Sequence, residues 1–176
     1  MAKRLAIDGF GQLELNQVAF RRDGRIEAQC HIANGIDYVE NGMLLAVDHA
    51  TRTVGYADED SKFIALNYTT EHMYDERLAY GLKHFKLDKN TFLPRLGYLA
   101  TGDKFTTNCI CVADEAAAED KATAAEVDVV IAAGAYGHAC ENGAILVNNV
   151  ADGALLKVIC ATTMPDGQYA VKFVAL

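Results

Sequence analysis

The sequence LGYLATGDKFTTNCICV, residues 96–112, is the stretch around which we expect the fold to be organised. Its Thr, Phe, Ile, Val and Cys residues suit a pleated strand, and Gly102 can adopt the positive φ that a tight hairpin turn demands. The stretch therefore predicts a hairpin of two strands, residues 96–100 and 105–112, around the turn 101–104. Neither alternating face of the second strand is fully polar, which predicts a central strand covered on both sides.

The chain on both sides of this hairpin consists of short apolar and β-branched runs separated by turn residues. An Asp-Gly pair predicts a first hairpin between residues 13–20 and 25–32. Pro165 and Gly167 predict the turn of a last hairpin, between residues 155–163 and 168–174. We expect about ten short strands, the others being residues 43–47, 53–56, 63–68, 83–87, 129–133 and 144–148.

Two segments predict short helices at the periphery. In residues 69–76 a threonine precedes several acidic residues, which is the pattern of a helix N-terminus. Residues 114–127 are rich in Ala and Glu, which have high helix propensity, but their apolar residues are nearly all alanine. We therefore expect this helix to lie outside the core, in an acidic, Ala-rich excursion of residues 113–128.

The order of these elements predicts the fold class. Strands do not alternate with helices, so we expect a mainly β fold: a single β-barrel or β-sandwich domain built from hairpins, with one or two short peripheral helices. Residues 1–11 show no sustained hydrophobic period and predict an N-terminal arm. The arm would precede a single β-rich domain of residues 12–176.

Composition narrows the classes of partner that the chain could bind. The 176 residues are 51% hydrophobic and carry a net charge of −8, a globular composition that can bury a core without disulfides or metal. An acidic chain without a basic stripe argues against nucleic-acid binding, and no run approaches the ~18 apolar residues of a membrane span. Residues 1–10 lack the apolar region of a signal peptide, so we expect synthesis in a cytoplasm and five reduced cysteines.

A first group of cysteines could bind metal. Cys109 and Cys111 lie on one face of the predicted central strand, near Cys30 and His31 if the hairpins pack together. A structural zinc site needs four ligands, usually including a C-x2-C turn, whereas cysteine in a strand is commonly a buried small hydrophobe. We therefore expect neither a metal site nor a cofactor.

A second group, His138, Cys140 and Glu141, lies in a glycine-rich loop of residues 134–143. A thiol, an imidazole and an orienting carboxylate are the parts of a nucleophilic hydrolase. Adjacency in a loop does not supply the locked geometry that these groups need. A solvated loop is favoured, and no catalytic residue is assigned.

Three segments resemble small head proteins of tailed bacteriophages, of the capsid decoration (cement) type. They are GMLLAVDHATRTVGYA (residues 42–57), IALNYTTEHMYDER (residues 64–77) and LPRLGYLATGDKFTTNCI (residues 93–110). The closing segment MPDGQYAVKF (residues 164–173) adds to the likeness, whereas the acidic segment 113–128 has no part in it.

This resemblance implies a virion structural protein, not an enzyme, that binds the capsid exterior and stabilises the head. Its partners would be the major capsid protein and further copies of itself, with a trimer favoured by the local threefold positions of capsid lattices. It would reside on the capsid surface after assembly in the host cytoplasm. The alternatives are a small cysteine-dependent hydrolase that uses the 134–143 loop, and a tail or adaptor component of the virion.

The expected contact residues lie in the N-terminal arm and in or beside the loops that connect the strands. The arm mixes basic and apolar side chains, and Phe10 is the expected anchor, because large buried side chains dominate interfaces. Tyrosines in or beside connections are further candidates, because tyrosine is enriched at interfaces. The expected capsid or inter-subunit contacts are Lys3, Arg4, Ile7, Phe10, Tyr68, Tyr74 and Tyr80.

Overall fold

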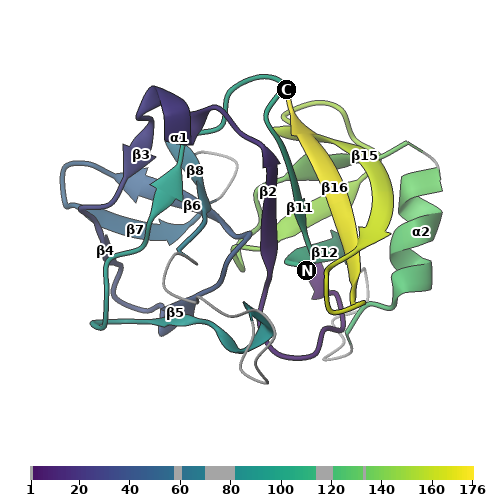
Figure 1. Ribbon diagram of the computed structural model, residues 1–176, viewed down its shortest axis with the longest axis horizontal. Helices are drawn as coiled ribbons and strands as arrows, with labels where there is room; N and C mark the ends of the chain where they lie inside the picture. The colour runs from purple at the N-terminus through teal and green to yellow at the C-terminus, as the bar shows by residue number, and fades with distance from the viewer. Residues whose placement is uncertain (1, 58–60, 70–81, 114–120, 133) are drawn as a thin grey trace.

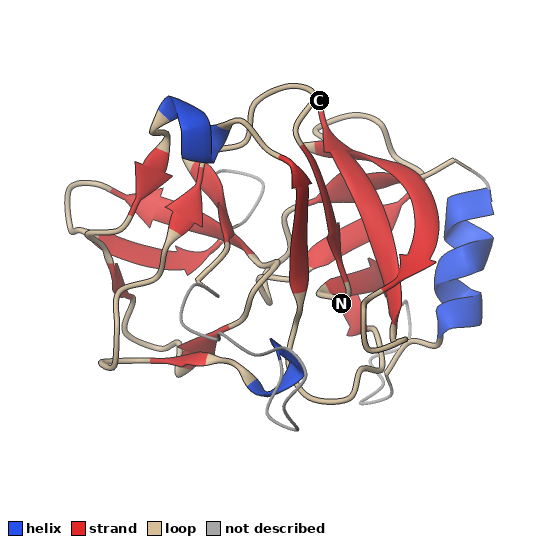
Figure 2. Ribbon diagram, in the orientation of Figure 1, coloured by secondary structure: helices blue, strands red, loops and turns tan. Residues whose placement is uncertain are grey.

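The computed structural model describes residues 2–57, 61–69, 82–113, 121–132 and 134–176. Within these ranges the chain forms three β-sheets, two α-helices and one 3-10 helix (Figures 1 and 2). The mainly β class is therefore confirmed. Among the described strands no sheet closes into a barrel, and the two larger sheets are compatible with a sandwich-like arrangement.

The largest sheet draws on both ends of the chain. Its eight strands are β1 (Ala2–Arg4), β2 (Leu13–Gln17), β11 (Lys104–Thr107), β12 (Ile110–Ala113), β13 (Tyr136–His138), β14 (Ile145–Asn148), β15 (Leu156–Thr163) and β16 (Tyr169–Ala175). Their order is β1-β12-β14-β13-β15-β16-β11-β2, and only the pair β12–β14 is parallel.

The eight-stranded sheet curls strongly. Only Asn108 and Cys109 separate β11 from β12, yet five strand spacings separate these strands in the sheet order. Five spacings of about 4.8 Å would span about 24 Å in a flat sheet, whereas the chain from Thr107 to Ile110 can span about 11 Å at most. The sheet must therefore bend back on itself for one chain to enter it at both places.

The second sheet has six short strands and lies beside the first (Figure 1). Its strands are β3 (Ile26–Glu27), β4 (His31–Ile32), β6 (Leu44–Asp48), β7 (Thr53–Tyr56), β8 (Ile64–Asn67) and β10 (Leu96–Gly97), in the order β3-β10-β8-β6-β7-β4. A third sheet pairs β5 (Tyr38–Val39) with β9 (Leu87–Asp88). The 3-10 helix η1 (Leu82–His84) and β9 occupy the region that was expected to be a strand at residues 83–87.

The organising stretch is a crossing between sheets, not the predicted hairpin. β10 pairs with β3 and β8 in the six-stranded sheet, whereas β11 pairs with β2 and β16 in the eight-stranded sheet. Asp103, which is 5% exposed, accepts hydrogen bonds from Ala19 N at 2.7 Å and from Ala100 N at 2.9 Å. Its own carbonyl accepts a hydrogen bond from Ala175 N at 2.8 Å. The bond with Ala100 closes the turn, whereas the bonds with Ala19 and Ala175 tie it to segments far away in the sequence.

The expectation of a doubly covered strand is confirmed for β12. Ile110 and Val112 pack into one hydrophobic cluster, and Cys109 and Cys111 pack into a second cluster on the other face. β6 divides in the same way, with Leu44 in the first cluster and Leu45 in the second. Strands buried on both faces explain the continuous apolar runs in the sequence.

The predicted first hairpin is also wrong. β2 joins the eight-stranded sheet and β3 joins the six-stranded sheet, and between them lies the short helix α1 (Phe20–Asp23). Gly24 has a φ of 69° and ends this helix, with the N–H of the following Arg25 donating to Phe20 O. The Asp-Gly pair therefore serves as a helix C-terminus, because burial of the Phe20 ring turns the chain inward there.

The N-terminal segment is not a free arm. β1 pairs with β12, Leu5 is 2% exposed, and Leu5 N donates to Ile110 O at 2.9 Å. Ala6 N and Ala122 O are joined by a further hydrogen bond of 2.8 Å. β1 is an edge strand of the eight-stranded sheet, and its three residues are too few for a period to show in the sequence.

The helix expected at residues 114–127 lies further along the chain. Residues 114–120 are outside the described ranges, and α2 (Ala124–Ala132) includes residues 129–132, which were expected to be a strand. A capping box starts the helix: Thr123 Oγ1 accepts from Glu126 N, and Glu126 Oε2 accepts from Thr123 N. Val127 is fully buried, so the helix contributes to the core and is not merely peripheral.

The closing hairpin agrees with its prediction. β15 and β16 pair from Leu156 with Ala175 to Thr163 with Tyr169, with one bulge between Val158 and Cys160, and Gly167 N donates to Met164 O across the turn. The helix expected at residues 69–76 falls outside the described ranges from residue 70 onward.

Candidate functional site

A pocket of about 490 Å³ lies between the two larger sheets. Ser61 and Ile64 line it from the six-stranded side, and His138, Leu146 and Asn148 line it from β13 and β14. Ligand sites commonly form in such clefts, with apolar walls and a few polar groups. This pocket therefore bears on the alternative that the 134–143 loop belongs to a hydrolase, although the sequence favours a solvated loop there.

His138 is held by the chain at the pocket rim. Its Nε2 lies 2.9 Å from Val150 O, and because a carbonyl only accepts, Nε2 is the donor. Asn148 Oδ1 accepts from Val150 N at 2.9 Å, which fixes the same loop. Neutral His138 is thus the tautomer with an unprotonated Nδ1.

Cys140 belongs to a different cluster. It is 7% exposed and packs with Met43, Cys111 and Ala144 in the second hydrophobic cluster. A hydrogen bond from the Cys111 thiol, together with backbone N–H groups, lowers the pKa of Cys140, and the same bond raises the pKa of Cys111. His138 and Cys140 are thus directed to separate places, and the contact that a thiol–imidazole nucleophile needs is not formed between them.

Four of the five cysteines lie in that second cluster: Cys30, Cys109, Cys111 and Cys140. Cys109 is fully buried and lies 3.6 Å from Arg4 Nη2. Burial raises the pKa of Cys109 to about 12 although Arg4 opposes the shift, so its thiol is protonated at neutral pH. Among the described residues, no three His, Cys, Asp or Glu side chains are grouped so that they could hold a metal ion.

An ion pair between the partly exposed Arg4 and the buried Glu40 lies at the junction between the sheets, and the sequence analysis selected Arg4 but not Glu40. Glu40 is 1% exposed and accepts hydrogen bonds from the two terminal guanidinium nitrogens of Arg4, Nη1 lying 2.8 Å from Oε1. The Glu40 carboxylate also accepts from Gly11 N at 2.5 Å, and its backbone carbonyl accepts from Asn67 Nδ2 at 2.8 Å. No local signal marks Glu40, because its partners are distant in sequence.

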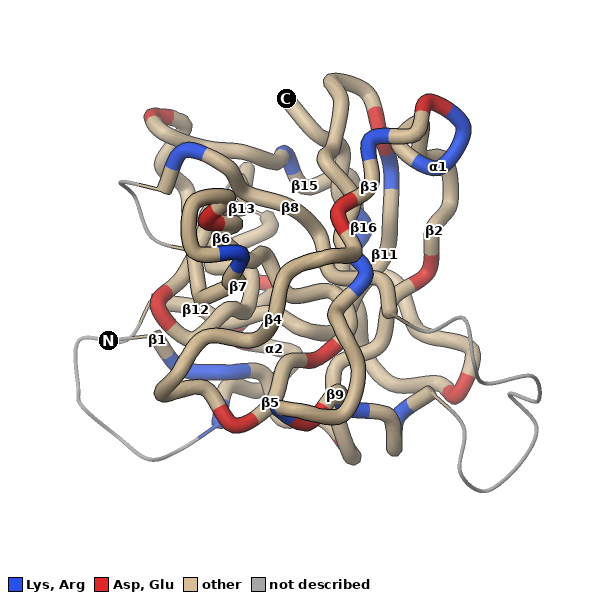
Figure 3. Tube along the Cα trace, turned by 90° about the vertical axis from the view of Figure 1, so that its left-hand side faces the viewer, with Lys and Arg blue, Asp and Glu red and all other residues tan. Residues whose placement is uncertain are grey.

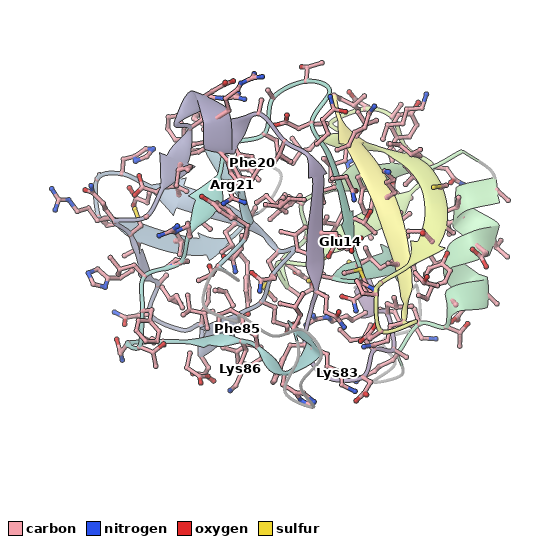
Figure 4. All side chains as sticks on the ribbon, in the orientation of Figure 1. Glu14, Phe20, Arg21, Lys83, Phe85 and Lys86 are labelled. Atoms are coloured by element: carbon pink, nitrogen blue, oxygen red, sulfur yellow. The ribbon has the colours of Figure 1, made fainter. Side chains whose placement is uncertain are left out.

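The expected contact residues of the arm are engaged within the chain. Lys3 Nζ lies 3.1 Å from Glu126 Oε1, and Ile7 is packed against the first hydrophobic cluster. The Phe10 ring makes an edge contact with Tyr38 at 5.7 Å, and Lys86 Nζ lies 5.6 Å from its centre. Figure 4 shows Lys83, Phe85 and Lys86 at this same end of the molecule.

The three tyrosines do not form a described contact surface. Tyr68 is 1% exposed and packs against Phe20 with ring centres 5.0 Å apart, so it is a core residue and not a surface anchor. Tyr74 and Tyr80 lie outside the described residues.

Other apolar side chains are exposed instead, and these were not selected from the sequence. Phe92 is 71% exposed and Leu93 is 39% exposed, beside a pocket of about 340 Å³ that Phe85 and Leu87 also line. Phe63 is 53% exposed and borders an open groove of about 600 Å³. In the sequence, these exposed residues could have been recognised because each lies in a loop that precedes a strand.

Charge on the described surface is mixed. Figure 3 shows Lys and Arg interspersed with Asp and Glu along the trace, without a basic stripe. Within the described part of the chain, no helix has the length and apolar character to cross a membrane.

Comparison with models of known protein families, with curated protein sequences and with solved structures finds no match to this chain.

Proposed function

We propose that this protein is a structural component of a tailed-phage virion that binds the capsid exterior and stabilises the head. In this role it is a binding protein and not an enzyme, and its partner is the major capsid protein. The resemblance of three sequence segments to decoration proteins motivates the proposal.

The observation that carries it is where those segments lie. Residues 42–57 contain β6 and β7, residues 64–77 contain β8, and residues 93–110 contain β10. These four strands are consecutive neighbours, β10-β8-β6-β7, in the six-stranded sheet, whereas β11 in residues 93–110 and β16, which the closing segment enters, belong to the eight-stranded sheet. Most of the likeness therefore falls on one continuous sheet, which can present a common surface.

Exposed apolar side chains flank the same strands. Phe63 immediately precedes β8, and Phe92 and Leu93 precede β10. Large apolar residues at the strand ends of a rigid sheet are suited to act as anchors in a partner's pockets. They replace Phe10 and Tyr68 as the preferred contact residues.

The test is decoration of purified capsids. Heads of the phage that encodes the chain, stripped of the protein, are incubated with an excess of it, and copy number and lattice position are measured by electron cryomicroscopy. We expect binding at stoichiometric copy number on the outer surface. Phe92→Asp should lower occupancy at least about tenfold, because it places a charge at a desolvated anchor.

The matched control is Leu176→Asp, at a 52% exposed apolar residue after β16, and it should leave occupancy unchanged. Absence of the protein from heads would contradict the proposal. Recovery with isolated tails would instead support a tail or adaptor component.

A further inference from the structure

One edge of β15 is left without a strand over most of its length. β16 pairs along one edge from Leu156 to Thr163, whereas β13 pairs along the other edge only at Leu156 and Lys157. Among the described residues, no strand pairs with residues 160–163 on the β13 side. Residues 159–163 are all exposed, so α2, which packs beside β15, leaves them uncovered.

The sequence of this edge lacks the usual protection against pairing. Residues 158–164, VICATTM, contain neither a charge nor a proline. Monomeric β proteins usually protect an exposed edge with Lys, Pro, a bulge or a covering helix. β15 has a bulge between Val158 and Cys160, but beyond it the pairing with β16 is regular to Thr163. The regular part is therefore a template for one more strand.

We propose that the added strand is β15 of a second copy of this chain, paired antiparallel around a twofold axis at Ala161. Charge favours this occupant. Each copy carries a net charge of −8, so two copies repel over much of their surface, but not along an uncharged edge.

The paired segment also fits the free part of the edge. In an antiparallel pair centred on Ala161, residues 159–163 of one copy lie opposite residues 163–159 of the other, and Lys157, where β13 already occupies the edge, stays outside the contact. The contact therefore brings no like charges together.

Apolar area is available around the paired edge. Ile159 is 45% exposed within β15, and Val129 is 73% exposed on the neighbouring helix α2. An isologous contact uses each of these residues twice. The result is a dimer and not the trimer that the phage resemblance implies, and it does not depend on the proposed virion role.

Cys160 is a built-in reporter of this pairing, because it is exposed while the other four cysteines are buried. With Ala161 opposite its own counterpart, the two Cys160 residues are diagonal neighbours on one face, about 7–8 Å apart. A bismaleimide of similar span should therefore join two chains through Cys160. The cross-link should be lost in Cys160→Ser.

Matched variants test the register in solution. Sedimentation of the full chain should show a dimer, and Ala161→Lys should raise its dissociation constant at least about tenfold, because two like charges face each other at the axis. Ala50→Lys, the same change in an exposed turn of the six-stranded sheet, should have no effect. An equimolar mixture of Ala161→Lys and Ala161→Glu chains should restore the dimer, which a general loss of folding would not allow.

The proposal is overturned by a chain that stays monomeric at about 100 μM, a concentration at which even weak edge pairing is populated. It is equally overturned by a dimer that Ala161→Lys leaves intact, or by a mixture that dissociates as readily as either variant alone.

Discussion

The two larger sheets are assembled in different ways. In the six-stranded sheet, β6, β7 and β8 lie within residues 44–67, and β7 and β8 both pair with β6. In the eight-stranded sheet, β1 pairs Ala2 with Ala113, and β11 pairs Phe105 with Phe173. Closing such long loops costs entropy before the contacts form. The centre of the six-stranded sheet can therefore be built from local segments, whereas the eight-stranded sheet needs both ends of the chain.

The sheets nevertheless share a core. Leu44 and Leu66 of the six-stranded sheet lie in the same hydrophobic cluster as Phe105, Ile110 and Phe173 of the eight-stranded sheet. The different assembly routes therefore lead to one packed unit, and a substitution in either sheet should be felt in the other.

The largest expected effect is that of Phe105→Ala in the eight-stranded sheet. Phe105 is fully buried, with its ring 5.7 Å from that of Phe173, so truncation should lower the free energy of unfolding by about 3–5 kcal/mol. Phe92→Ala, at a 71% exposed site, should change it by about 0.5 kcal/mol or less. Hydrogen exchange should show lost protection in both sheets. Loss confined to the eight-stranded sheet would mean that the two sheets unfold separately.

The next effect concerns the ion pair where the sheets meet. Arg4→Ala leaves the buried Glu40 carboxylate without its counter-charge, so unfolding in urea should show a loss of about 3 kcal/mol. The neighbouring Lys3→Ala removes a partly exposed pair with Glu126 and should cost about 1 kcal/mol or less. Equal losses from the two variants would show that the Arg4–Glu40 pair is no more than a surface contact.

A smaller effect is expected from Gly97→Ala in the six-stranded sheet. A Cβ at Gly97 would lie 2.5 Å from the Phe20 ring, so α1 must shift, at a cost of about 1–3 kcal/mol. Gly55→Ala, in β7 of the same sheet, meets nothing within 4 Å and is the control, with little or no change in melting temperature. Phe20→Leu should restore part of the loss in the double variant. Additive losses would instead place the strain elsewhere.

The smallest effect belongs to the α2 capping box. Hydrogen bonds from Thr123 and an ion pair with Lys3 lower the pKa of Glu126 from 4.5 to about 2. Because the folded pKa is the lower one, the stabilisation is fully present above about pH 4.5 and is lost as pH falls towards 2. Glu126→Ala should therefore lower the melting temperature slightly at pH 7 and not at pH 2. Asp152→Ala, at an exposed carboxylate, is the control; a difference that persists at pH 2 would exclude the titration of Glu126 as its cause.

The sequence by itself determined the local features of this protein. Alternating and continuous apolar runs placed β6, β7, β14 and β16 to within a residue or two, and the Pro-Asp-Gly turn specified the closing hairpin. The burial of Cys109–Val112 on both faces of the sheet was also predictable from the sequence, because a strand that is covered on both faces has no polar side. These properties depend on residues that are close together in the chain.

Only the tertiary structure decided which strands meet. The hydrogen bonds of Asp103 to Ala19, and of Ala175 to Asp103, send β10 and β11 to different sheets, although their sequence is that of a hairpin. The same long-range packing buries Tyr68, separates His138 from Cys140 and places Glu40 against Arg4. A strand pairs through backbone groups that every residue carries, so its choice of partner is made by side chains far away in the chain.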